Sequence, residues 1–329
     1  MKKLLVVALA AFAMVACVNE EVTELPQGDA ITFESAFIDN ATRAAVDPST
    51  TTATLDGFNV WGFVKEYDGE IFNGTEVEKV GGVWGYEGTQ YWVPNQPYYF
   101  AALAPMNGSW TVTKAIEGAA KLGLGTVSFT NNAGTEDLLY AKAMMTSKGL
   151  NEPNGAVKFQ FQHLLSKVKF TFKNGFTTDN AYVEVKNVTM SAPKKAHIDL
   201  AVADYSNGWV IEEHDALAFG NVQKLDASVK EGGVSEAEAA YERLTIPADA
   251  NYEYTIEFDI VLYMGTEVAY EVTKTSAVTG VALEMGHAYN FFTEINPQNL
   301  ELREIVFEGS AAEMEAAGAD FTLQTKMML

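Results

Sequence analysis

The most reactive side chains of this sequence are few and widely spaced. Cys17 is the only cysteine, which excludes an internal disulfide and a thiolate metal site. Phosphate loops and the GxSxG and HExxH motifs are missing, although two of the 44 acidic residues could still form a glycosidase pair. The histidines stand too far apart along the chain for paired metal ligands: His163, His197, His214 and His287. We therefore expect no enzyme, no metal site and no cofactor.

Covalent modification is the chemistry that best suits Cys17. Lys2 and Lys3 precede an apolar run from Leu4 to Met14, which is typical of an export signal and too short to span a membrane as a helix. Val15-Ala16-Cys17 completes a stretch that resembles the lipobox of bacterial lipoproteins, whose cysteine is acylated, for example with palmitate. A plain secretory signal that happens to end near a cysteine is the alternative. The lipobox reading predicts a signal peptide over residues 1–16 and a lipid anchor at Cys17.

The acidic balance of the chain limits its partners. The formal net charge is −22, and loss of residues 1–16, with two lysines and no acidic residue, would make it −24. Nucleic acid is then an unsuitable partner, because phosphate binding requires a positive face. Asn19-Glu20-Glu21 resembles the acidic tract that marks some lipoproteins for the outer face of the outer membrane. We expect an exported outer-membrane lipoprotein precursor that reaches the cell surface.

The first strand-like segment of the mature chain is isolated between loops. Residues 17–29 are polar, contain Pro26 and Gly28, and suit a flexible tether. Ile31, Phe33 and Phe37 then share one face at period two, which predicts a half-buried strand. Residues 39–56 favour a long exposed loop that holds one basic residue, Arg43, the only one between Lys3 and Lys65.

Short apolar runs between turn signals predict β-structure over the rest of the chain. Strands are expected at 58–64, 90–93, 98–104, 126–130, 137–143, 157–162, 167–173, 182–188, 196–202, 244–246, 252–263, 267–273 and 287–293. Aromatic residues crowd the first half, and we expect them to fill a core rather than form a glycan platform. Residues 151–155 are the best domain junction, which gives β-sandwich domains over 30–155 and 156–329. Two short helices are predicted, beginning at Ser235 and Ser310, because a glutamate follows each serine three positions later.

An ordered set of strand fragments resembles the fimbrillin (Mfa-like) family over most of the mature chain. The fragments are Ile31-Thr-Phe33, Thr42-Arg43-Ala44, Phe58-Asn-Val60-Trp61-Gly62-Phe63, Tyr91-Trp92-Val93-Pro94, Tyr98-Tyr-Phe100-Ala-Ala102, Asp137-Leu-Leu-Tyr140-Ala141, Phe161-Gln-His163-Leu-Leu165-Ser-Lys167-Val168 and Gly286-His287-Ala-Tyr289-Asn290-Phe291. Their order and spacing carry the resemblance together, since each alone is an ordinary strand fragment.

The resemblance implies a lipoprotein-derived pilus subunit with two transthyretin-like β-sandwich domains in tandem. It also implies that an Arg-specific protease removes the N-terminal strand and that a neighbouring subunit's C-terminal strand fills the groove. Arg43 and Ala44 flank the bond that fits such a cut, and Ile31, Phe33 and Phe37 mark the strand that would leave. Other pilus subunits, the protease and the outer membrane are the expected partners. The position in the pilus, whether stalk, tip or base, stays open.

The end of the chain has the pattern of a donor strand. Phe321, Leu323, Met327 and Leu329 fall on one face, interrupted only by Thr325, and residues 321–329 contain neither proline nor glycine. The alternative is a last strand that completes the chain's own second sandwich. As a function, a structural pilus subunit contributing to adhesion is expected. The alternative is a monomeric surface lipoprotein that binds a glycan or a protein.

Overall fold

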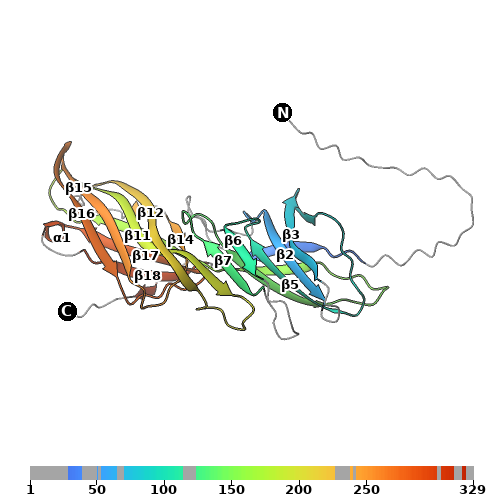
Figure 1. Ribbon diagram of the computed structural model, residues 1–329. Helices are drawn as coiled ribbons and strands as arrows, with labels where there is room; N and C mark the ends of the chain where they lie inside the picture. The colour runs from blue at the N-terminus through green and yellow to red at the C-terminus, as the bar shows by residue number, and fades with distance from the viewer. Residues whose placement is uncertain are drawn as a thin grey trace, which may run out of the picture.

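The computed structural model describes residues 29–38, 50, 53–64, 70–113, 124–226, 238–239, 242–301, 305–314 and 321–323. The expected signal peptide, Cys17, Arg43, Ala44, Met327 and Leu329 lie outside these residues. The described chain is mostly β, with nineteen strands and the short helix α1 (Pro297–Glu301). The strands form three sheets, and Figure 1 shows the early strands at one end of an elongated molecule and the late strands at the other.

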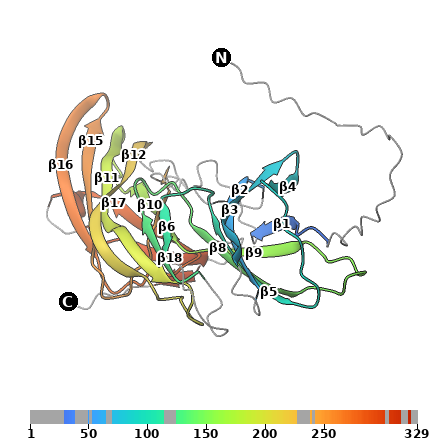
Figure 2. The same ribbon diagram turned by 45° about the vertical axis from the view of Figure 1, so that its right-hand side comes forward.

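Seven strands form the N-terminal sheet. In spatial order they are β1 (Phe33–Ile38), β9 (Val157–His163), β8 (Leu139–Thr146), β5 (Pro97–Ala104), β2 (Gly57–Val64), β3 (Glu70–Val80) and β4 (Val83–Tyr86). The sheet is curled, because the Phe33 ring on β1 lies 5.7 Å from the Tyr86 ring on β4, at the opposite end of the strand order. Figure 2 shows β1 between β9 and β4.

Two six-stranded sheets form the other end of the molecule. The terminal sheet has the order β13 (Glu238–Ala239), β10 (Ser166–Asn174), β17 (His287–Ile295), β18 (Glu308–Glu313) and β19 (Phe321–Leu323), and β14 (Arg243–Thr245) also pairs with β10. The long sheet has the order β16 (Glu267–Val278), β15 (Tyr254–Met264), β11 (Ala181–Asp199), β7 (Thr126–Thr130) and β6 (Trp110–Thr113), and β12 (Val210–Asp226) also pairs with β11.

Alternation along each strand explains how these sheets bury their cores. Along β9, Val157, Phe159 and Phe161 are buried while Lys158 and Gln160 are exposed, as the period-two pattern predicts. The terminal and long sheets share one core, to which β10, β17, β11 and β15 contribute. The N-terminal sheet encloses a second core, in which Trp84, Trp92, Tyr98 and Phe100 are buried as expected, whereas Tyr91 is 45% exposed. A third core joins the two ends, with Trp61 and Leu103 packing together with Phe129, Leu244 and Met314.

Sheet membership does not change at residues 151–155. Strand β9 follows that segment but pairs with β8 and β1, and the change of sheet comes between His163 and Ser166. In the other direction, β7 precedes the segment but pairs with β11 of the long sheet. The division into two transthyretin-like domains stays a prediction.

Several local predictions differ from the structure. Residues 182–188 and 196–202 are expected as separate strands, yet β11 covers the first and reaches Asp199 in the second as one strand, pairing with β15 in its first part and with β7 in its last. The helix expected from Ser310 is wrong, because β18 occupies that segment and pairs with β17. The helix expected from Ser235 also differs from the structure, because Glu238–Ala239 form strand β13, which pairs with β10. In each case pairing with a neighbouring strand outweighs the local capping signal.

Candidate strand-exchange site

Among the described residues, strand β1 pairs with one strand, β9. It runs parallel to β9, with Phe33 opposite Val157 and Ile38 opposite Phe161, and the register shifts between Glu34 and Phe37. A salt bridge of 2.9 Å joins Glu34 to Lys158, but both side chains are largely exposed, so it stabilises the pair little. Since β1 ends the order of the N-terminal sheet, its departure would break no other strand pair.

The residues just before β1 are held from both sides. Ile31 N donates to Gln90 O at 2.7 Å, and Trp92 N donates to Asp29 O at 2.9 Å. The Tyr86 hydroxyl donates to Ile31 O at 2.8 Å. Burial raises the pKa of Tyr86, which keeps that hydroxyl protonated as a donor. These contacts hold the segment against Tyr86, the last residue of β4, and against residues 90–92.

Phe33 is a deeply buried aromatic residue of this segment. It is 5% exposed, and Ile31 is 1% exposed. Five aromatic rings lie within 6.4 Å of the Phe33 ring, four in edge-to-face geometry and one stacked: Phe58, Phe72, Tyr86, Phe100 and Phe159. Burial of such a side chain contributes about 2–3 kcal/mol, and favourable ring pairs add about 0.5–1.5 kcal/mol each. The groove under β1 is therefore aromatic and specific in shape.

The chain leaves β1 at Ile38 and is described again at Thr50, whose backbone is anchored by a buried acid. Thr50 N donates to Asp137 Oδ2 at 2.6 Å. The same oxygen lies 2.9 Å from His163 Nδ1, and the Asp137 and His163 side chains have no exposed surface. Asp137 begins the path into β8, and His163 ends β9. Residues 39–49, which contain Arg43, thus connect β1 to a fixed point.

We expect Asp137→Ala to lower the free energy of unfolding by about 2–4 kcal/mol. The reason is that the Thr50 amide and the His163 ring would lose a buried acceptor, and buried unsatisfied groups are costly. Urea denaturation of the chain lacking residues 1–16 measures the loss. Asp137→Asn, which keeps one acceptor oxygen, is the control and should lose less. An unchanged midpoint in Asp137→Ala would show that the buried acid contributes nothing.

The predicted donor strand at the C-terminus lies in the terminal sheet, whereas β1 lies in the N-terminal sheet. In β19, Phe321 pairs with Ala311 and Leu323 pairs with Gly309 of β18. Strand β18 itself pairs with β17, and Met314 just after it is buried in the third core. Strand β19 is therefore an edge strand of its own sheet, with backbone pairing over three residues. The structure does not bring Phe321 and Leu323 together with Ile31 and Phe33, and only the backbone of Phe37 is described.

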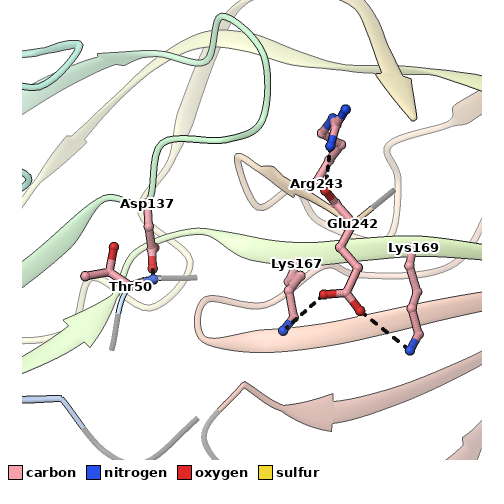
Figure 3. A network of polar contacts seen from close by, with 6 residues as sticks. All are labelled: Thr50, Asp137, Lys167, Lys169, Glu242 and Arg243. Atoms are coloured by element: carbon pink, nitrogen blue, oxygen red, sulfur yellow. Dashed lines mark hydrogen bonds and ion pairs between the residues drawn. The ribbon is translucent and has the colours of Figure 1, made fainter. Parts of the chain in front are cut away.

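A network of charged side chains connects β10 to the start of β14 (Figure 3). The Glu242 carboxylate lies 3.6 Å from Lys167 Nζ and 3.6 Å from Lys169 Nζ. Arg243 Nη1 donates to Glu242 O at 2.9 Å, and its Nε donates to Ala218 O at 2.8 Å. At 3.6 Å these ion pairs are longer than hydrogen bonds, and we expect each to contribute little to stability.

Sequence reasoning missed the residues that support β1. Tyr86, Gln90 and Trp92 hold the segment through one side chain and two backbone groups. Trp92 belongs to a fragment that carries the family resemblance, but nothing in that fragment indicates this contact. His163 was expected to be an ordinary structural residue, and its pairing with Asp137 carries no sequence signal. Among the described residues no cluster of three or more metal-binding side chains occurs. In the same residues no helix is long and apolar enough to cross a membrane.

Comparison with known proteins identifies the fold. A fimbrial protein from Bacteroides vulgatus has a TM-score of 0.56 and 14% identity, with 87% of this chain and 99% of that chain covered. Two proteins assigned to cell adhesion have lower TM-scores: one from Bacteroides uniformis (0.48, 16% identity, 87% and 99% covered) and one from Bacteroides ovatus (0.45, 17% identity, 87% and 96% covered). No relative was found among curated proteins. The family model for fimbrillin-like proteins matches residues 42–310, which is most of the chain. This protein belongs to the fimbrillin-like family.

Proposed function

We propose that this protein is a structural subunit of a surface pilus that contributes to adhesion and assembles by protease-triggered strand exchange. In this mechanism, cleavage after Arg43 releases β1, and the C-terminal strand of a neighbouring subunit enters the vacated groove. The observation that carries the proposal is the environment of β1. The strand fills a site lined by aromatic rings, pairs with one strand in the described part of the chain, and is followed by a long connection to Thr50.

The segment to be replaced and the proposed donor have similar apolar stripes. Ile31 and Phe33 are buried on one side, while Thr32 and Glu34 are exposed. Phe321 and Leu323 alternate with Thr322 and Gln324 in the same way. A donor of nine residues, 321–329, would span roughly 30 Å at about 3.3 Å per residue, which is enough to line one edge of a sheet.

Two features favour release of the strand only after cleavage. Before cleavage, residues 39–49 connect β1 covalently to Thr50. If β1 leaves its groove, it therefore stays close to the groove and can rebind intramolecularly. After cleavage, only noncovalent contacts hold the fragment, and a competing strand can replace it. The lipid anchor at Cys17 would hold the precursor at the outer membrane until that moment. Cut after Arg43, the subunit loses the anchor and enters the pilus.

Replacement of Arg43 tests the proposal. Arg43→Ala should abolish cleavage at this position by an Arg-specific protease and with it polymer formation, because β1 stays tethered. The measurement is a ladder on a mild detergent gel after incubation of the chain lacking residues 1–16 with such a protease. Arg43→Lys is the matched control for charge, and it should also fail because the protease requires arginine.

Two results would contradict this account. Unchanged ladders in Arg43→Ala would remove Arg43 from the mechanism. Complete cleavage of the wild-type chain at Arg43 without any ladder would favour the alternative function, a monomeric surface lipoprotein. Far-UV circular dichroism of each variant shows that the monomer is folded.

A further inference from the structure

A cavity in the late half of the chain is separate from the strand-exchange groove. It has a volume of about 300 Å³ and lies between the turn before β12, the loop that leads into β15, and Leu283. Its lining includes Asn207, Trp209, Asp249, Asn251 and Tyr252. This volume is at the lower end of the range for small-ligand sites.

Both aromatic side chains of the cavity are held in place by their polar atoms. Trp209 Nε1 donates to Leu164 O at 3.0 Å. The Tyr252 hydroxyl lies 3.0 Å from His214 Nδ1, and its ring centre lies 4.5 Å from that of Tyr254. Both residues are partly exposed. Because the surrounding protein satisfies the polar atoms, the rings are pre-oriented and their uncovered surface suits contact with apolar parts of a ligand.

Polar side chains stand beside these rings. Asn207, Asp249 and Asn251 are exposed and lie on two turns. Asp249 Oδ1 accepts a hydrogen bond from Asn251 N at 2.8 Å, which fixes the turn and leaves further acceptor capacity on the carboxylate. The two amide side chains each offer one acceptor and two donors. A carboxylate and amides next to two aromatic rings match a ligand that has hydroxyl groups on its rim and C–H groups on its faces.

Charge selects among such ligands. Asp249 contributes a negative charge, and the described lining contains no lysine or arginine. An anionic ligand would therefore meet repulsion without a compensating cation. A pyranose ring without an acidic group has the required combination, since its C–H face stacks on an aromatic ring and its vicinal hydroxyls pair with carboxylate and amide oxygens.

We propose that this cavity binds a terminal sugar of a neutral glycan, with Tyr252 and Trp209 as stacking surfaces and Asp249, Asn251 and Asn207 as hydroxyl partners. The site lies outside the β1 groove and does not depend on strand exchange. A pilus subunit with such a site would contact glycans along its own surface.

An array of immobilised glycans provides the test. The folded chain lacking residues 1–16 is applied to neutral N-linked, mucin-type and plant glycans, with sialylated and sulfated glycans on the same surface. We expect binding to a subset of the neutral glycans and none to the anionic ones. The strongest neutral hit is then titrated as a soluble oligosaccharide, with saturation-transfer NMR as the readout.

Substitutions locate the site. Tyr252→Ala should weaken binding of that oligosaccharide at least tenfold. Asn251→Ala should weaken it several-fold, and because Asn251 is exposed this variant keeps the fold. Tyr270→Ala is the matched control, since Tyr270 is a partly exposed tyrosine on β16 outside the cavity. Absence of binding to every neutral glycan, preference for anionic glycans, or binding that Tyr252→Ala and Asn251→Ala both leave intact would overturn the proposal.

Discussion

Phe33→Ala is expected to lower the free energy of unfolding of the uncleaved chain by about 3–5 kcal/mol. The side chain is 5% exposed and its ring contacts five others, so truncation removes apolar burial and leaves a cavity among rigid rings. Equilibrium denaturation in urea, on the chain lacking residues 1–16, measures the change. Thr32→Ala is the matched control, because Thr32 is exposed on the opposite face and its carbonyl still accepts from Val157 N.

The same substitution bears on strand exchange. A β1 segment without the Phe33 ring should leave its groove faster after cleavage, so ladders should form sooner than in the wild-type chain. A loss below about 1 kcal/mol, which is the size of an ordinary surface substitution, would show that Phe33 does not hold β1 in place. A Thr32→Ala effect as large as that of Phe33→Ala would assign the stability to the backbone rather than to the ring.

Deletion of residues 321–329 is expected to leave a folded monomer that cannot extend a polymer. In the residues that the structure describes, β19 pairs with β18 over three residues, while β18 is also paired with β17. Loss of β19 therefore removes few contacts from the described chain, whereas the proposed donor would be lost completely. Circular dichroism and the mild detergent gel after protease treatment measure the two effects separately.

Point substitutions sharpen this test. Leu323→Asp places a charge on the apolar stripe and should block extension, because burying a carboxylate among aromatic rings costs its solvation. Thr322→Asp, on the other face, should extend nearly as well as the wild type. Unfolding of the deleted chain would show that the strand completes its own sandwich. Ladders that form normally without residues 321–329 would eliminate these residues as the donor.

Local alternation determined the β-character of this protein and the position of several strands. The strand expected at 126–130 coincides with β7, and the buried and exposed positions of β9 follow the predicted order. Such patterns are local because side chains of successive residues point to opposite faces of a sheet. The isolated strand around Phe33 was also visible in this way, since its apolar residues stand between polar loops.

Which strands pair with each other depended on tertiary structure. No local pattern states that β1 runs parallel to β9 and lies beside β4, because Phe33 stands 124 positions from Val157 and 53 positions from Tyr86 in the sequence. In β18, Ser310 and Glu313 favour the start of a helix locally, but the segment pairs with β17 instead. Strand β12 was missed because its sequence is rich in charged residues, and it gains stability by pairing along β11.

The sequence alone indicated the mostly β character, carried the fimbrillin resemblance and supplied the residues of the proposed strands. Only tertiary structure showed the aromatic groove under β1, the Asp137–His163 pair that anchors Thr50, and the cavity between Trp209 and Tyr252. The reason is physical. Apolar periodicity is a property of neighbouring residues, whereas a groove, a buried hydrogen bond or a cavity exists only where distant segments are packed against each other.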